Sequence, residues 1–283
     1  MPLRRSLLAG LLGAAAWFGA PEPAAAGCGS VPAPCRVSSG DYELALPAHA
    51  DHSGGATALP AVVFLHGHGS AGATVMRNRS LVDGLLLRGY AVIAPTALPR
   101  WQGKRSWNFL PGREGRDEAL FLREVVADAQ YRAGVDPQRV LLAGFSAGAF
   151  MVNYLACSHP GDFAAYAPVA GGFWDPLPAD CAGPVRLFHT HGWADTVVPL
   201  EGRFLAGGAF RQGDVFAGLA LWRHVNRCPS DAPANQGARG QWSWRLWSCN
   251  SRADLVFSLV PNGHVVPGEW PHRVLDWFEA RGD

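Results

Sequence analysis

Short apolar runs of four to six residues recur along the chain, each bounded by Gly, Pro, Asn, Asp or Ser. Runs of this length and composition predict buried β-strands. Helical patterns fill the gaps between several of them, and this alternation is typical of an α/β fold with a mostly parallel sheet and helices on both faces. The predicted strands are Tyr42–Leu46, Ala61–Leu65, Ala91–Ala94, Val140–Ala143, Ala165–Val169, Val185–His189 and Leu255–Val260.

The clearest predicted helix is Asp117–Tyr131, because acidic residues stand at its start and the following apolar residues recur on one face. A final helix is predicted near Arg273–Ala280. Two segments rich in Pro, Ser and Gly, Asp51–Pro60 and Pro229–Gly240, are predicted loops. Without an internal repeat or a linker, we expect a single domain over residues 27–283.

The first 26 residues have the pattern of an export signal. Two arginines at positions 4 and 5 precede a nearly continuous apolar stretch over residues 7–18, and small alanines at 24–26 fit a cleavage site. The stretch is short for a membrane span, and prolines follow it. We therefore expect a signal peptide over residues 1–26 and a secreted or periplasmic protein, exported by the Sec or the twin-arginine route.

Cysteine usage gives a second indication of export. All six cysteines follow this segment, and an even number in an exported protein predicts disulfides. Six cysteines allow 15 pairings, and neighbours in sequence give the simplest set: Cys28–Cys35, Cys157–Cys181 and Cys228–Cys249. As an alternative, Cys28 is the lipid-bearing residue of a lipoprotein, since residues 25–28 loosely resemble a lipoprotein cleavage site.

Overall charge narrows the class of partner. The formal net charge is +1, and the Lys and Arg residues are scattered along the chain. No global field attracts nucleic acid or anionic lipid, so we expect neither as a partner. The 48% hydrophobic content of the 283 residues is enough for one large core.

Candidate chemistry begins at Gly-Phe-Ser-Ala-Gly, residues 144–148, which follow the predicted strand Val140–Ala143 and precede an apolar helical segment. A serine in such a strand–turn–helix junction has a strained backbone, and a side chain at either glycine would collide with the neighbouring strand or helix. The strain lifts the hydroxyl clear of the sheet. This context predicts Ser146 as a nucleophile.

A serine nucleophile needs a base, and the base needs an acid. Asp195 and His264 each follow a predicted strand, and both come after Ser146 in the order Ser, Asp, His that this type of fold uses. The competing residues fit less well, because His272 lies within the last predicted helix and Asp175 follows the strand directly after the nucleophile helix. We therefore predict Ser146, Asp195 and His264 as a catalytic triad.

The tetrahedral intermediate of acyl transfer needs two N–H donors for its oxyanion. Ala147 follows the nucleophile and supplies the first. The second is predicted at His68, through its backbone N–H, in the Gly-rich loop 66–72 after the strand Ala61–Leu65. Among the aromatic residues in loops, Trp193 and Trp107 are candidates for the substrate pocket.

Two His-x-His pairs offer a different chemistry. His66 and His68, like His189 and His191, stand at strand ends with a spacing that could hold a metal ion. A metal-dependent hydrolase would not need the serine turn at residues 144–148. We therefore expect no metal, and we keep a metal-dependent hydrolase as an alternative.

Five segments together resemble the polyhydroxybutyrate depolymerase-type esterases, with exported feruloyl and acetylxylan esterases as near relatives: Phe64–Gly67, Ala143–Gly148, Tyr166–Gly171, His191–Pro199 and Gly263–His264. The resemblance implies the α/β-hydrolase fold, no cofactor, and hydrolysis of small-molecule or oligomeric esters through an acyl-enzyme. It places nucleophile, acid and base on Ser146, Asp195 and His264. It also implies a disulfide between Cys157 and Cys181.

The chain departs from that family at Ala149, which replaces a glycine, and at His68, where smaller or hydroxylated residues are frequent. Depolymerases of solid polymer carry a separate binding module. We find none, which favours soluble oligoesters or small acyl esters. A serine peptidase on the same fold and a binding protein with an inactive triad are the remaining alternatives.

Overall fold

The computed structural model describes residues 27–48, 58–110, 112–249 and 253–280. The predicted signal peptide, residues 1–26, lies outside the described residues. Within the described ranges, none of the helices combines the length and the apolar character that crossing a bilayer requires.

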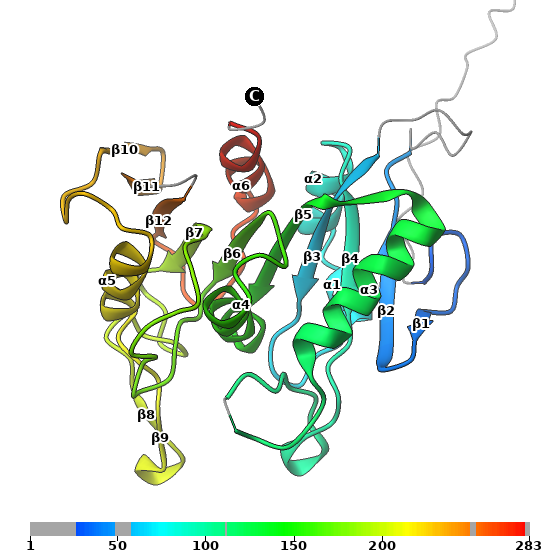
Figure 1. Ribbon diagram of the computed structural model, residues 1–283, viewed down its shortest axis with the longest axis horizontal. Helices are drawn as coiled ribbons and strands as arrows, with labels where there is room; N and C mark the ends of the chain where they lie inside the picture. The colour runs from blue at the N-terminus through cyan, green and yellow to red at the C-terminus, as the bar shows by residue number, and fades with distance from the viewer. Residues whose placement is uncertain (1–26, 49–57, 111, 250–252, 281–283) are drawn as a thin grey trace, which may run out of the picture.

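One large sheet forms the centre of the described part of the chain, with its strands in the order β1-β2-β4-β3-β5-β6-β7-β12-β11-β10 (Figure 1). The strands from β4 to β12 in this order pair in parallel, and antiparallel strands extend both edges. A separate hairpin, β8–β9, stands apart from this sheet. The strands are β1 Cys35–Val37, β2 Gly40–Ala45, β3 Leu59–Leu65, β4 Ala91–Pro95, β5 Val135–Phe145, β6 Ala165–Val169, β7 Arg186–Gly192, β8 Phe204–Leu205, β9 Phe210–Arg211, β10 Asn235–Arg239, β11 Trp242–Ser248 and β12 Asp254–Val260.

Helices cover both faces of the sheet, which confirms the predicted layering; Figure 1 shows α3 and α4 in front of the strands and α2 behind. Strand side chains alternate between the faces, so Val63 and Leu65 join one hydrophobic cluster while Val62 and Phe64 join the other. The first cluster includes residues of α3, α4 and α5, and the second includes residues of α1, α2 and α6. The helices are α1 Gly72–Met76, α2 Arg79–Leu86, α3 Glu118–Ala133, α4 Ala147–Ser158, α5 Val215–Val225 and α6 Trp270–Glu279, with short 3₁₀ turns at Trp101–Gly103 and Ala206–Gly208.

The ends of α3 follow from local chemistry. The Asp117 side chain accepts a hydrogen bond from the Leu120 N–H at 3.0 Å and caps the first turn. At the other end Gly134 adopts a left-handed conformation with φ 67°, which glycine tolerates at a helix C-terminus. The helix thus lies close to the predicted Asp117–Tyr131, and it runs on to Ala133.

The prediction of a loop over Pro229–Gly240 was wrong for its second half, because Asn235–Arg239 is the edge strand β10. This segment is polar and mostly exposed, so it has no apolar run that a strand pattern would reveal. Its pairing with β11 makes it a strand, through the register Asn235–Leu246 to Arg239–Trp242.

The three disulfides of the structure are Cys28–Cys35, Cys157–Cys181 and Cys228–Cys249. They confirm the pairing of sequence neighbours among the 15 pairings that six cysteines allow. The second bond ties the end of α4 to the segment that precedes β7, and the third ties the segment after α5 to the end of β11.

Candidate active site

Ser146 occupies the junction between β5 and α4 with φ 56° and ψ −120°. Positive φ is rare for a residue other than glycine and indicates a strained turn. Both flanking glycines are required by space: a methyl group at Gly144 would lie 2.6 Å from the Gly148 carbonyl carbon, and one at Gly148 would overlap the Leu65 carbonyl oxygen. The elbow therefore has the strand and helix contacts that the sequence predicted.

Asp195 and His264 are joined by a hydrogen bond, 2.7 Å between His264 Nδ1 and Asp195 Oδ2. The carboxylate can only accept, so Nδ1 donates its proton and Nε2 is left as the acceptor of a neutral ring. The other carboxylate oxygen, Oδ1, accepts from the N–H groups of Val197 and Val198, each at 2.8 Å. Asp195 is buried, whereas the His264 side chain is 16% exposed. A fixed acid thus orients an imidazole that solvent can reach.

The carboxyl ends of three parallel strands bring these groups to one edge of the sheet. Ser146 follows β5, while Asp195 and His264 follow the neighbouring strands β7 and β12. The His264 ring lies 4.6 Å from that of Phe145, between ring centroids, so the histidine packs beside the residue that precedes the serine. Close backbone contact locks the two loops together, because a methyl group at Gly192 would overlap the Asn262 carbonyl oxygen.

The loop after β3 approaches the elbow from the other side. A methyl group at Gly67 would lie 3.4 Å from Ser146 Cβ. The next residue is His68, whose side chain is exposed, and its backbone N–H lies in the loop where we predicted an oxyanion donor. The Gly69 N–H donates to the Arg105 carbonyl at 2.8 Å, which ties this loop to the connection between β4 and α3.

His66 has a structural task in that loop. Its Nδ1 lies 2.7 Å from the Gly67 carbonyl oxygen, to which it donates, and its Nε2 accepts from the Ala97 N–H at 3.0 Å. Burial lowers the pKa of His66 to about 4, so the ring is neutral at pH 7. Both ring nitrogens are used, and the imidazole fixes the loop that faces Ser146.

Two more histidines, His189 and His191, are buried behind Asp195. Burial lowers the pKa of each below the usual value, so both rings are neutral. His191 Nε2 lies 2.8 Å from the Val198 carbonyl oxygen and donates to it, which leaves Nδ1 to accept from His189 Nε2 at 3.0 Å. This pair braces the loop that carries Asp195, a role that the spacing of the two residues did not reveal.

The structure also bears on the alternative of a metal-dependent hydrolase. Among the residues that the structure describes, no three His, Cys, Asp or Glu side chains are grouped as ligands of one ion. His66 and His191 instead make hydrogen bonds to loop carbonyls and to an amide, and His189 bonds to His191.

The two tryptophans chosen as pocket candidates have opposite environments. Trp193 is 69% exposed just before Asp195, and it has a large surface to offer a ligand. Trp107 is only 2% exposed, and its indole N–H donates to the His66 carbonyl at 2.8 Å. Trp107 therefore has almost no surface for a substrate, and the prediction that it lines a pocket is corrected: it supports the loop after β3. The sequence could not separate the two because both lie in aperiodic loops.

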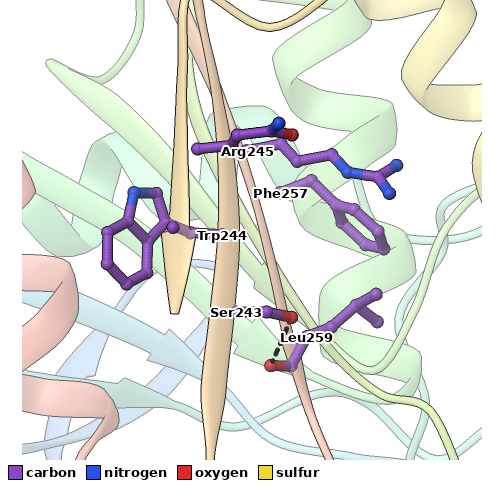
Figure 2. Close-up of a pocket in the computed structure, with 7 residues that line it drawn as sticks. Ser243, Trp244, Arg245, Phe257 and Leu259 are labelled. Carbon is purple, nitrogen blue, oxygen red and sulfur yellow. Dashed lines mark hydrogen bonds between the residues drawn. The ribbon is translucent and has the colours of Figure 1, made fainter. Parts of the chain in front are cut away.

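A hollow with other lining residues lies on the antiparallel extension of the sheet. This groove has a volume of about 340 Å³ and is lined by β10, β11 and β12. Figure 2 shows Arg245, Phe257 and Leu259 on one side of the strands and Trp244 on the other. The Ser243 hydroxyl donates to the Leu259 carbonyl at 3.5 Å within it. Its lining includes neither the elbow nor the Asp195 and His264 loops.

Comparison with known proteins relates the chain to a family. Residues 41–175, which include the elbow, match the family model described as Esterase PHB depolymerase. Poly(3-hydroxyalkanoate) depolymerase C from Paucimonas lemoignei is 30% identical over 220 residues, which cover 76% of this chain and 50% of that protein. The chain belongs to the PHB depolymerase-type esterase family.

Other similarities fit this family. Feruloyl esterase B from Piromyces equi is 33% identical over 143 residues, 46% of this chain and 26% of that protein. The chain spans half or less of the length of the curated relatives it matches. The solved acetyl xylan esterase from Aspergillus awamori superposes with a TM-score of 0.61 at 17% identity, covering 84% of this chain and 93% of that one. This likeness confirms the α/β-hydrolase fold of a PHB depolymerase-type esterase.

Proposed function

We propose that this protein is a carboxylic ester hydrolase that acts through Ser146, His264 and Asp195. The observation that carries the proposal is the 2.7 Å hydrogen bond between His264 and a buried Asp195, at the sheet edge where the strained Ser146 turn also lies. An acceptor nitrogen held in this tautomer is the group that a serine hydroxyl needs as a base.

In the proposed reaction, Ser146 Oγ attacks the ester carbonyl carbon while His264 Nε2 takes the hydroxyl proton. The N–H groups of Ala147 and His68 hold the negative oxygen of the tetrahedral intermediate. Collapse of the intermediate breaks the bond to the alcohol, which leaves with the proton from His264. Water then attacks the acyl-serine in the same way, with His264 again as base, and releases the acid and the free hydroxyl.

The substrates proposed are short-chain or hydroxyalkanoate oligoesters, with feruloyl and acetyl esters as further candidates. Family membership supports this range, since the relatives' names include poly(3-hydroxyalkanoate) depolymerase and feruloyl esterase. No cofactor enters the mechanism. Three disulfides support export to an oxidising compartment, with the signal peptide over residues 1–26. The lipid anchor at Cys28 is not retained, because the disulfide to Cys35 uses the sulfur that the lipid would need.

Replacing the nucleophile tests the mechanism. Ser146→Ala should reduce p-nitrophenyl butyrate turnover to the background rate and abolish labelling by a fluorophosphonate, with an unchanged melting temperature. Ser158→Ala is the matched control, because Ser158 ends the same helix and its hydroxyl contacts the Tyr154 carbonyl and His159 Nδ1 rather than Asp195 or His264. Full turnover by Ser146→Ala would refute the assignment, and a preference for peptide nitroanilides over esters would favour the serine peptidase.

A further inference from the structure

A second hollow lies beside the candidate active site. It has a volume of about 350 Å³ and lies between the β4–α3 connection and the β8–β9 hairpin, both of which extend beyond the same edge of the sheet (Figure 1). We call it the aromatic cleft and define it by Leu110, Arg113, Trp174, Asp175, Phe210 and Arg211. No residue of the proposed mechanism lines it.

One wall of the aromatic cleft is fixed by backbone and ring contacts. The Asp175 N–H donates to the Arg211 carbonyl at 2.9 Å, which binds the segment after β6 to the β8–β9 hairpin. The rings of Trp174 and Phe210 meet edge to face, 6.0 Å between centroids. This wall is therefore already in place before a ligand arrives.

The opposite wall is anchored as well. Phe109 precedes Leu110, and its ring stacks on that of Trp174 with centroids 6.4 Å apart. The backbone N–H of Asn108 donates to Glu118 Oε1 at 3.1 Å, and Glu118 pairs at 2.7 Å with Arg116 in a buried ion pair. The connection that carries Arg113 is thus held to the start of α3, and the cleft keeps its shape.

The cleft is close enough to the elbow for one substrate to reach both. The Trp174 ring lies 5.5 Å from that of Phe150, and the Phe150 N–H donates to the Ser146 carbonyl at 3.1 Å in the first turn of α4. One helical turn and one ring contact separate the cleft wall from the nucleophile, a distance on the order of 10 Å.

The lining chemistry selects one class of ligand. Leu110, Trp174 and Phe210 supply apolar surface, and the Arg113 guanidinium lies 5.9 Å from the centre of the Phe210 ring. Arg211 lies 3.5 Å from Asp175 and above the Phe204 ring. The lining thus contains two arginines and one carboxylate. The lining has an excess positive charge, and guanidinium groups bind carboxylates with paired N–H donors.

We propose that the aromatic cleft binds a carboxylate carried by the substrate, so that the protein prefers esters whose apolar chain ends in a free acid. This proposal rests on the ester hydrolysis proposed above and adds a substrate class to it. The free acid end of an oligoester has this chemistry. In such a complex the chain lies along Trp174 and Phe210, and the terminal carboxylate pairs with Arg113 and with Arg211, where it competes with Asp175.

Matched esters test the proposal. Monoethyl suberate and diethyl suberate share the reacting ester and the chain, and they differ in one carboxylate. The ratio of their kcat/KM values should favour the monoester in the wild type, and Arg113→Gln or Arg211→Gln should lower this ratio roughly fivefold, chiefly through KM, since exposed ion pairs are modest. Asp175→Asn should raise the ratio, because it removes the competing carboxylate.

Arg239→Gln is the matched control, since it removes the same charge from the edge strand β10 at a different part of the sheet and should leave the ratio unchanged. Ratios that stay within twofold of the wild type in the Arg113, Arg211 and Asp175 variants would overturn the proposal while ester hydrolysis stands. Calorimetric binding of suberate to Ser146→Ala separates the two proposals further. It needs no turnover, and it should weaken when Arg113→Gln is added; unchanged binding would count against the cleft.

Discussion

Gly148, the second glycine of the elbow, has no space for a side chain. A methyl group there would overlap the Leu65 carbonyl oxygen, and it would lie 2.7 Å from the Leu65 carbonyl carbon and 2.9 Å from the His66 carbonyl oxygen. Ordinary contact begins at 3.4 Å. All three atoms belong to the backbone where β3 ends, so no side-chain rotation can relieve the overlap. Gly148→Ala must push α4 and β3 apart.

The size of the effect follows from that geometry. Separating the two elements by about 1 Å in a packed interior costs roughly 3 kcal/mol, the upper end for overpacking, because backbone rather than side chains must move. For a domain of this size that corresponds to a melting temperature lower by roughly 6–12 °C. Activity should fall further than stability, because Gly67 faces Ser146 just beyond the displaced residues and a 1 Å misplacement can cost about 100-fold in rate.

Thermal unfolding by circular dichroism and p-nitrophenyl butyrate turnover below the transition measure the two effects separately. Gly161→Ala is the control, because a methyl group at Gly161 has no heavy atom within 4 Å and the residue is exposed; its stability should change by less than about 0.5 kcal/mol. The packing of the elbow described above would be refuted if Gly148→Ala kept full activity and melted within about 2 °C of the wild type, a shift that corresponds to about 0.5 kcal/mol.

Three further predictions concern the surroundings of the site. Burial lowers the pKa of His66 from 6.5 to about 4, so the neutral ring's contribution to stability is complete above pH 6.5 and is lost as the pH falls toward 4. The free energy of unfolding should therefore fall by about 3 kcal/mol between pH 7 and pH 4 through this group. In denaturant unfolding, His66→Gln should show a decrease over this pH range that is smaller by that amount. Trp107→Phe leaves the buried His66 carbonyl without its indole donor and should lower the free energy of unfolding by about 1–3 kcal/mol, with reduced kcat; unchanged values in both assays would contradict the supporting role. Replacing Cys157 and Cys181 together by Ser opens a loop with a sequence separation of 24 and should cost about 3 kcal/mol in urea unfolding, an effect that should vanish when wild type and variant are compared under full reduction.

Patterns local to a few residues were sufficient to predict much of the fold. The run Ala61–Leu65 lies within β3, and the elbow lies between β5 and α4, because an apolar run and a Gly-rich turn carry their conformational preference in their own atoms. The edge strand Asn235–Arg239 was missed for the opposite reason. Its polar side chains carry no strand signal, and only pairing with β11 supplies the backbone hydrogen bonds.

Residue types could nominate the candidate site, but they could not assign every role. Trp107 and Trp193 are both tryptophans in loops, yet the Trp107 side chain is 2% exposed and the Trp193 side chain is 69% exposed. His66 and His191 matched a metal-ligand spacing, yet their rings bind carbonyl and amide groups of the loops beside Ser146 and Asp195. These distinctions depend on which distant segments meet, and spacing along the chain carries no such information.

The sequence was sufficient to predict the strained turn at Ser146 and the order in which the candidate serine, acid and histidine occur; it offered the pairing of neighbouring cysteines as the simplest of 15, and the structure selected it. Each of these depends on residues close together or on order along the chain. The tertiary structure alone decided which aromatic rings face solvent, which histidines brace loops, and that Arg113 and Arg211 converge on one cleft. The exposure of a ring and the meeting of two arginines at one cleft depend on contacts between segments far apart in sequence. Side chains of the same type therefore have different roles in different packing environments.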